Sequence, residues 1–128
     1  MAIEKQLSIF VQNKVGSLEE LCENLSKANI NIRAFSIVDD LDWGIVRIIV
    51  DDPEKAKEIL HKLGLMYGEG NVLTVELKNH PGTLAELAHK LSQKKINIEN
   101  AFATATGSGS FLVLSTTDDK KAQSILNA

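Results

Sequence analysis

The sequence predicts an α+β fold made of two tandem modules, each an antiparallel sheet with both helices on one face. Three observations predict it: an internal duplication, a strand–turn–helix signal in each copy, and one order of strand and helix patterns in both. Residues 13–21 read NKVGSLEEL and residues 79–87 read NHPGTLAEL, 66 positions later. At this offset residues 5–62 and 71–128 share 16 identities over 58 ungapped positions, so we treat the chain as an internal repeat.

Composition excludes several classes of protein. The net charge of −3 offers no basic surface for a nucleic acid. No apolar stretch approaches the roughly 20 residues that cross a bilayer, and the apolar run at residues 7–11 is too short for a signal peptide. The single cysteine, Cys22, cannot form an internal disulfide and fits a reducing compartment. We expect a cytoplasmic protein with neither a membrane nor a nucleic-acid partner.

The first module, residues 1–68, is expected to have the order βαββαβ. In its first strand Leu7, Ile9 and Val11 alternate on one face. Ser17, with Glu20 three positions later, has the spacing of a capping box at a helix start. The expected elements are a strand over 6–12, a helix from Ser17, strands over 30–38 and 45–50, a helix from Pro53 and a short strand over 65–67. Residues 68–70, which read GEG, are interpreted as the linker.

The second module, residues 69–128, repeats this order without its last strand. Its expected elements are a strand over 72–78, a helix from Thr83 with Glu86 completing the capping box, strands over 96–105 and 111–115, and a helix opened by Asp118 and Asp119. The strand over 72–78 is therefore left with an unpaired edge. Residues 2–5, a strand of the other half or a second chain are expected to cover it, and a homodimer is the favoured solution.

Two short motifs carry a resemblance to a known family. Residues 79–84 read N-H-P-G-T-L at the first strand–helix turn, and the first copy has Val15 in place of the proline. The tripeptide I-N-I opens the second strand at residues 30–32 and again at 96–98. With the order βαββαβ, these motifs resemble the ACT domain, a family of small ferredoxin-like regulatory modules that often bind amino acids. The resemblance covers nearly the whole chain, twice.

The resemblance implies a ligand site where two modules meet. The strand–helix loop of one module would supply backbone amides and an asparagine, and the second-strand asparagine of a neighbour would add side-chain contacts. The ligand-binding residues implied are Asn13, Val15, Gly16, Ser17, Leu18, Asn31, Ile32, Asn79, His80, Pro81, Gly82, Thr83, Leu84, Asn97 and Ile98. Some serine-binding relatives have a histidine two residues before the loop asparagine; Val11 and Leu77 stand there in this chain, which argues against serine.

Physical chemistry supports such a site and also offers an alternative. A helix N-terminus presents unpaired N–H groups and the positive end of a dipole, which suit an α-carboxylate. An asparagine amide both donates and accepts hydrogen bonds, so it can bind an ammonium group as well. The alternative is that each asparagine is a turn residue that hydrogen-bonds its own backbone. Recurrence of both asparagines in both copies favours the site.

Two other short motifs resemble a calcium-binding loop and a phosphate-binding loop, but neither has the residues or the position that such a loop requires. Asp39, Asp40 and Asp42 lack the glutamate that a calcium loop carries eleven residues after its first ligand, where Val50 stands. We interpret them as a hairpin tip, with Trp43 packed over the sheet edge or at a contact surface. Residues 107–109 read GSG between two predicted strands and are interpreted as a turn, since a phosphate-binding loop precedes a helix. We expect no metal, no cofactor and no catalytic residue.

The sequence therefore predicts a non-enzymatic regulatory protein, a sensor that binds an amino acid or similar small metabolite and acts on a partner enzyme. The alternative is a ligand-free structural or docking module that dimerises or regulates a partner enzyme. An enzyme with His80 as its base is the weakest hypothesis, because a general base needs a positioned partner and none shares its loop.

Overall fold

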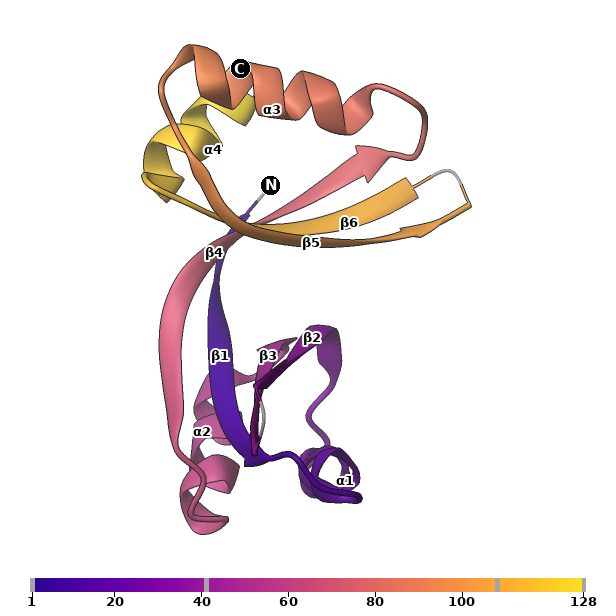
Figure 1. Cartoon of the computed structure of the whole chain (residues 1–128), viewed down its shortest axis with the longest axis vertical. Coiled ribbons are helices and arrows are strands. Elements are labelled where there is room, and N and C mark those ends of the chain that lie inside the picture. Colours follow the sequence, from indigo (N-terminus) through magenta and orange to yellow (C-terminus); the bar gives the residue numbers. More distant parts are fainter. Residues whose placement is uncertain (1, 41, 108, 128) are drawn as a thin grey trace. The chain divides into compact units, whose positions relative to one another are not determined.

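The computed structural model describes residues 2–40, 42–107 and 109–127 (Figure 1). The chain divides into two compact units. The N-terminal unit is Lys5–Gly70, and the C-terminal unit comprises the chain from Asn71 onward together with the residues up to Glu4. The predicted hairpin turns include Leu41 and Ser108, which lie outside the described residues.

The order of elements repeats the predicted α+β pattern. The N-terminal unit contains β1 (Ala2–Gln12) from Lys5 onward, α1 (Ser17–Lys27), β2 (Ile32–Asp40), β3 (Trp43–Val50), α2 (Pro53–Lys62) and the start of β4 (Tyr67–Lys78). The C-terminal unit contains the rest of β4, α3 (Thr83–Gln93), β5 (Ile98–Thr106), β6 (Gly109–Thr116) and α4 (Asp119–Asn127). In Figure 1, α3 and α4 lie together on one face of the sheet of their unit. The ferredoxin-like fold predicted for both modules is confirmed.

Strand register reproduces the duplication. β1 and β3 pair antiparallel with Leu7 opposite Ile48, and β4 and β6 pair antiparallel with Leu73 opposite Leu114, each residue shifted by 66. The antiparallel pair β2–β3 has an irregularity in β2 after its first residue, and β5–β6 has the same irregularity at the equivalent position of β5. The two copies therefore share backbone geometry as well as sequence.

Each unit buries the apolar face that its periodicity predicts. In the N-terminal unit the core is formed by alternate strand residues and the helix stripes: Leu7, Ile9, Val11, Leu21, Leu25, Ile30, Val46, Ile48, Val50, Ala56 and Leu60. The C-terminal core has the same construction: Leu73, Val75, Leu87, Leu91, Ile96, Leu112, Leu114 and Ala122. Burial of these side chains supplies the main driving force for folding each unit.

The predicted capping boxes are wrong by one position. Gly16 and Gly82 are the N-cap residues of α1 and α3, with φ of 91° and 89°, and neither helix has a side-chain cap hydrogen bond. Ser17 and Thr83 are the first helical residues. Glycine takes the cap because the chain turns there through the left-handed region, which is strained for other residues. Ser17 and Thr83 therefore belong to the first turn of their helices and do not cap them.

The predicted linker at residues 68–70 is also wrong. β4 runs without a break from Tyr67 to Lys78. Gly68 and Gly70 are absent from the left-handed residues of the described chain, so their backbone is compatible with a strand. Between them, Glu69 accepts a hydrogen bond from Lys57 Nζ of α2 at 2.8 Å. That bond favours the charged forms, so it lowers the pKa of Glu69 and raises that of Lys57.

The start of β1, one of the three expected covers, lies beside the edge of β4. The strand order is β2-β3-β1-β4 in the N-terminal unit and β1-β4-β6-β5 in the C-terminal unit. In the C-terminal sheet, the part of β1 that pairs with β4 consists of residues 2–4. The hydroxyl of Thr74 donates to the Ala2 carbonyl at 3.5 Å and to the Glu4 carboxylate. The N-terminal extension thus takes the place of a final strand.

Candidate functional site

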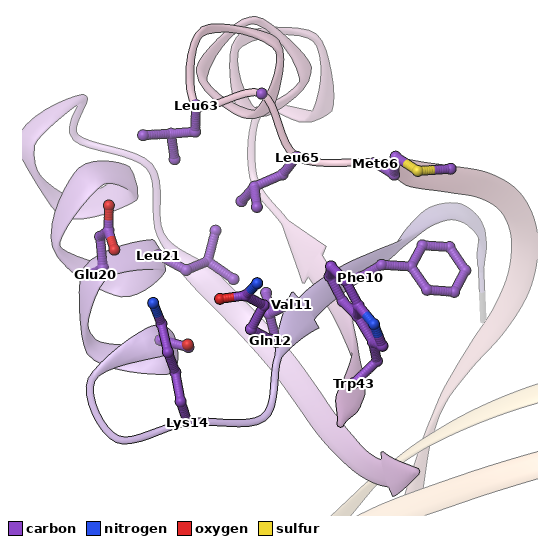
Figure 2. Close-up of a pocket in the computed structure, with 12 residues that line it drawn as sticks. Phe10, Val11, Gln12, Lys14, Glu20, Leu21, Trp43, Leu63, Leu65 and Met66 are labelled. Carbon is purple, nitrogen blue, oxygen red and sulfur yellow. The ribbon is translucent and has the colours of Figure 1, made fainter. Parts of the chain in front are cut away.

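The N-terminal unit contains a cavity of about 540 Å³ at the end of its sheet (Figure 2). Binding pockets for small molecules generally have roughly 300–1,000 Å³. The lining comes from the end of β1, the turn that follows it, the first turns of α1, the start of β3 and the α2–β4 connection: Phe10, Val11, Gln12, Lys14, Ser17, Glu20, Leu21, Trp43, Leu63, Gly64, Leu65 and Met66. The cavity has the size of a small-molecule site.

Its inner wall is apolar. Val11 and Leu21 are 5% and 2% exposed and belong to the core. They face inward because Val11 lies on the core face of β1 and Leu21 on the apolar stripe of α1. Leu63 and Leu65 are half-buried and close the wall from the α2–β4 connection. A molecule that enters therefore meets hydrocarbon at its inner end.

Backbone hydrogen bonds hold the α2–β4 connection in place. The N–H of Leu65 donates to the Leu60 carbonyl at 3.1 Å, and the N–H of Phe10 donates to the Met66 carbonyl at 2.9 Å. Gly64 has φ of 69°, a left-handed conformation that ends α2 and that glycine adopts without strain. The connection is therefore bonded both to α2 and to β1, which defines this side of the cavity.

Three large apolar side chains form an exposed rim. Phe10, Trp43 and Met66 are 39%, 51% and 76% exposed. Figure 2 shows them together on one side of the cavity. Phe10 points to the sheet face opposite Leu7, Ile9 and Val11, since side chains alternate along a strand. Exposed apolar groups gathered at a cavity are typical of binding surfaces rather than of packing.

The opposite side of the cavity carries charge. Lys14 and Glu20 are both exposed, and neither forms an ion pair with any residue in the described part of the chain. In Figure 2 the nitrogen of Lys14 points toward the side where Glu20 and Gln12 lie. A tight turn presents Lys14: its N–H donates to the Gln12 carbonyl at 2.9 Å, and its carbonyl accepts from the Ser17 N–H at 3.3 Å. The site therefore offers one ammonium and one carboxylate group.

The structure separates the predicted residues of the N-terminal unit into two groups. Asn13, Val15 and Gly16 are exposed in the β1–α1 loop, Ser17 lines the cavity, and Leu18 packs against the core. Asn31 precedes β2 and Ile32 begins it, at the other end of the sheet. Gln12 pairs with Trp43 and Ile32 pairs with Val50, seven residues further along β3 and therefore about 23 Å away. One unit alone does not bring the two asparagines together.

Both second-strand asparagines anchor the same backbone junction. The N–H of Asn31 donates to Asp51 Oδ1 at 3.0 Å, and the N–H of Asn97 donates to Thr117 Oγ1 at 3.1 Å. The side-chain amides of both are exposed and bond to none of the described residues. Ile32 and Ile98, which follow them, are half-buried against their cores. The asparagine side chains remain available to a ligand.

The loop of the C-terminal unit uses its polar side chains internally. Asn79 Nδ2 donates to the Gly107 carbonyl at 3.0 Å, which ties the loop to the β5–β6 turn. His80 Nδ1 lies 3.1 Å from Thr83 Oγ1 and 3.1 Å from the Pro81 carbonyl. Thr83 is half-buried, and the other predicted residues of this loop, Asn79, His80, Pro81, Gly82 and Leu84, are exposed. The Asn79 amide therefore does not bond its own turn: it joins this loop to the β5–β6 turn.

Sequence reasoning missed most of the cavity. Of the predicted ligand-binding residues, Ser17 alone is among the described residues that line it. A comparison of the two copies could have indicated the rim residues. Phe10 corresponds to Glu76 in the second copy, and Trp43 corresponds to Gly109. An aromatic residue on the polar face of a strand, replaced by a charged one in the repeat, indicates a role outside the core.

A family model described as an ACT domain pair matches residues 1–128. The chain belongs to the ACT domain family. The match spans both copies of the repeat, so the resemblance inferred from the loop and I-N-I motifs is confirmed. Within the described residues of this ACT domain pair, no three His, Cys, Asp or Glu side chains form a group that could hold a metal ion, and no helix is long and apolar enough to cross a membrane.

Solved structures resemble the ACT domain pair along its length. Protein BT0572 from Bacteroides thetaiotaomicron is 35% identical, with a TM-score of 0.93, over 98% of this chain and 87% of that one. The ligand-free regulatory subunit of aspartate kinase from Thermus thermophilus is 13% identical, with a TM-score of 0.75, over 98% of this chain and 93% of that one. The regulatory subunit from Thermus flavus is also 13% identical, with a TM-score of 0.70, over 98% and 92%. The two kinase subunits share the fold. No curated protein matches the chain.

Proposed function

We propose that this ACT domain pair is a non-enzymatic regulatory protein of the cytoplasm that binds an amino acid or a similar small metabolite and signals its presence to a partner enzyme. The observation that carries the proposal is the cavity of about 540 Å³ beside the β1–α1 loop. Membership of the ACT family supports it, and so does the fold shared with regulatory subunits of aspartate kinase.

The geometry of the two strand–helix loops supports the ligand contacts that we propose. With glycine at the cap and no side-chain cap bond, α1 and α3 keep N–H groups of their first turns for a carboxylate. We therefore place a ligand carboxylate on the amides after Gly16 or Gly82. Its ammonium group would meet the free amide of Asn31 or Asn97 from a neighbouring module.

A thermal-shift screen tests this proposal. A ligand that binds only the folded state, at a hundred times its Kd, stabilises it by about 2.7 kcal/mol. For a chain of 128 residues we expect the Tm to rise by about 5 °C or more with at least one of the twenty amino acids. Asn97→Ala should reduce that rise and leave the unliganded Tm nearly unchanged, because the side-chain amide bonds to none of the described residues and the substitution keeps the backbone N–H that bonds Thr117.

The outcome separates the sensor from its alternative. If all twenty amino acids at millimolar concentration leave the Tm unmoved, the ligand-free docking module replaces the sensor. The β2 edge gives that alternative a surface, since Phe35, Ile37 and Val38 are 53%, 51% and 44% exposed there. We also propose that this edge mediates homodimer formation, because β1 already covers the edge of β4.

A further inference from the structure

We infer that the cavity of the N-terminal unit is selective for amino acids with a bulky apolar side chain, and that each chain carries one such site. The inference rests on the proposed function and adds the ligand class, the unit that binds it and the stoichiometry. For this cavity it assigns the charged groups of the ligand to Lys14 and Glu20 in place of the helix amides and the asparagines. It is carried by the division of the cavity into an apolar rim and a charged side, and by the contrast with the C-terminal unit (Figure 2).

The fold does not require the apolar rim. In the C-terminal unit Lys78 pairs with Gly109 as Gln12 pairs with Trp43, so both strand pairs end in the same register. That register is reached with glycine in place of Trp43. Glu76 likewise stands in β4 where β1 has Phe10. Because the same backbone forms without the aromatic side chains, their exposure in the N-terminal unit indicates an apolar ligand group that covers them.

The charged side matches the other end of an amino acid. Lys14 supplies an ammonium group for an α-carboxylate, and Glu20 supplies a carboxylate for an α-ammonium group. Ser17, which lies between Lys14 and Glu20 in the sequence, also lines the cavity, and its hydroxyl can both donate and accept a hydrogen bond. Since Lys14 and Glu20 are exposed, their ion pairs with the ligand contribute little to the binding free energy and mainly set its orientation. Apolar contact therefore decides which amino acid binds.

The C-terminal unit lacks the rim, and its counterparts of the charged side have partners within the unit. His80 Nδ1 lies 3.1 Å from Thr83 Oγ1, and Glu86 forms an ion pair with Lys90 at 3.9 Å. His80 and Glu86 stand at the positions of Lys14 and Glu20, whereas Glu76 and Gly109 replace the aromatic pair. A bulky apolar side chain would meet a carboxylate there in place of Phe10. The N-terminal unit alone therefore has the features needed for selectivity, which predicts one bound molecule per chain.

Trp43 makes the test direct, because it is the only tryptophan of the chain and lines the cavity. The full chain is titrated with L-leucine, L-phenylalanine, glycine and L-aspartate while tryptophan emission is recorded. Leucine and phenylalanine are expected to shift the emission and to bind roughly 10- to 100-fold more tightly than glycine or aspartate, as burial of a large apolar side chain implies.

Variants locate the binding within the cavity. Phe10→Ala is expected to weaken leucine and phenylalanine binding roughly tenfold, by loss of apolar contact. Phe102→Ala is the matched control, since Phe102 lies on β5 of the C-terminal unit and does not line the cavity. It should leave both affinities unchanged. Equal losses in the two variants would show that the emission change does not come from the rim.

Truncated ligands test the charged side. Phenethylamine lacks the carboxylate of phenylalanine, and 3-phenylpropionate lacks its ammonium group. In the wild type both should bind more weakly than phenylalanine. Lys14→Met should abolish the preference for phenylalanine over phenethylamine, and Glu20→Gln should abolish the preference over phenylpropionate. If neither preference changes, the assigned pairing is wrong.

The two experiments distinguish failure of this inference from failure of the proposed function. If amino acids raise the Tm but leave Trp43 emission unchanged, the protein is still a sensor and the cavity is not its site. Glycine binding as tightly as leucine, or two molecules per chain by calorimetry, would also overturn the inference. If no amino acid changes either signal, both the inference and the sensor function fail.

Discussion

Gly16 and Gly82 have nearly the same backbone conformation in the two units, with φ of 91° and 89°. A Cβ added at either position would meet no atom within 4 Å. The requirement for glycine is therefore a matter of backbone torsion and not of space. These residues end the strand, set the angle at which α1 and α3 leave the sheet, and so position the loops beside the candidate sites.

Because backbone torsion and not available space decides the effect of an added Cβ, alanine substitutions at two glycines should change stability in opposite directions. Gly82→Ala should lower the free energy of unfolding by about 1–2 kcal/mol, because alanine is strained in the left-handed region. Gly68→Ala should raise it by about 0.5–1 kcal/mol, because Gly68 lies in β4 without positive φ and also has open space around it. Urea denaturation measures both, and a loss of stability in both variants would contradict the argument.

At the scale of elements, β1 and β4 are the strands that belong to both units. β1 supplies residues 5–12 to the N-terminal sheet and residues 2–4 to the C-terminal one, and β4 is likewise divided at Gly70. The edge of β4 in the C-terminal unit is covered by only a few residues of β1. We therefore expect this pairing to be the part of the C-terminal sheet that opens most readily.

Removal of residues 1–4 should expose that edge. In a chain that begins at Lys5, the amides of β4 that face β1 should exchange with solvent faster, whereas amides in β3 of the N-terminal unit should keep their protection. Hydrogen exchange followed by mass spectrometry measures both. Thr74→Val is the milder comparison, since it removes only the hydroxyl that bonds Ala2 and Glu4. Unchanged exchange at β4 in the shortened chain would show that another segment covers it.

At the scale of the whole molecule, the remaining edge strand of the N-terminal unit is the expected contact between copies. β2 ends that sheet and exposes Phe35, Ile37 and Val38. Sedimentation at micromolar concentration should give a species of twice the 14.0 kDa chain mass. Ile37→Lys should yield the monomer, because a lysine on an edge strand opposes pairing. Val15→Lys, at a fully exposed loop position, is the control that should remain dimeric. A monomeric wild type would exclude the homodimer.

Short-range periodicity was sufficient for the fold. The alternation of Leu7, Ile9 and Val11 and the stripe of Leu21 and Leu25 each depend on residues a few positions apart, and each is buried as predicted. The duplication then assigned the same elements to the second copy. Spacing alone did not determine the element boundaries. The hydroxyl spacing suited a capping box at Ser17, but Gly16 is the cap because its backbone is left-handed, which the spacing does not encode.

Long-range contacts decided the rest. The composition of residues 68–70 is typical of a linker, yet the chain there stays extended as part of β4, with Lys57 bonded to Glu69. The cavity likewise joins residues near positions 10, 20, 43 and 65. The loop motif indicated Ser17, but it could not indicate Phe10 or Trp43. By itself the sequence determined which side chains face each core, because that follows from local geometry. Only the tertiary structure decided which exposed side chains surround the cavity, because their neighbours come from segments far apart in the chain.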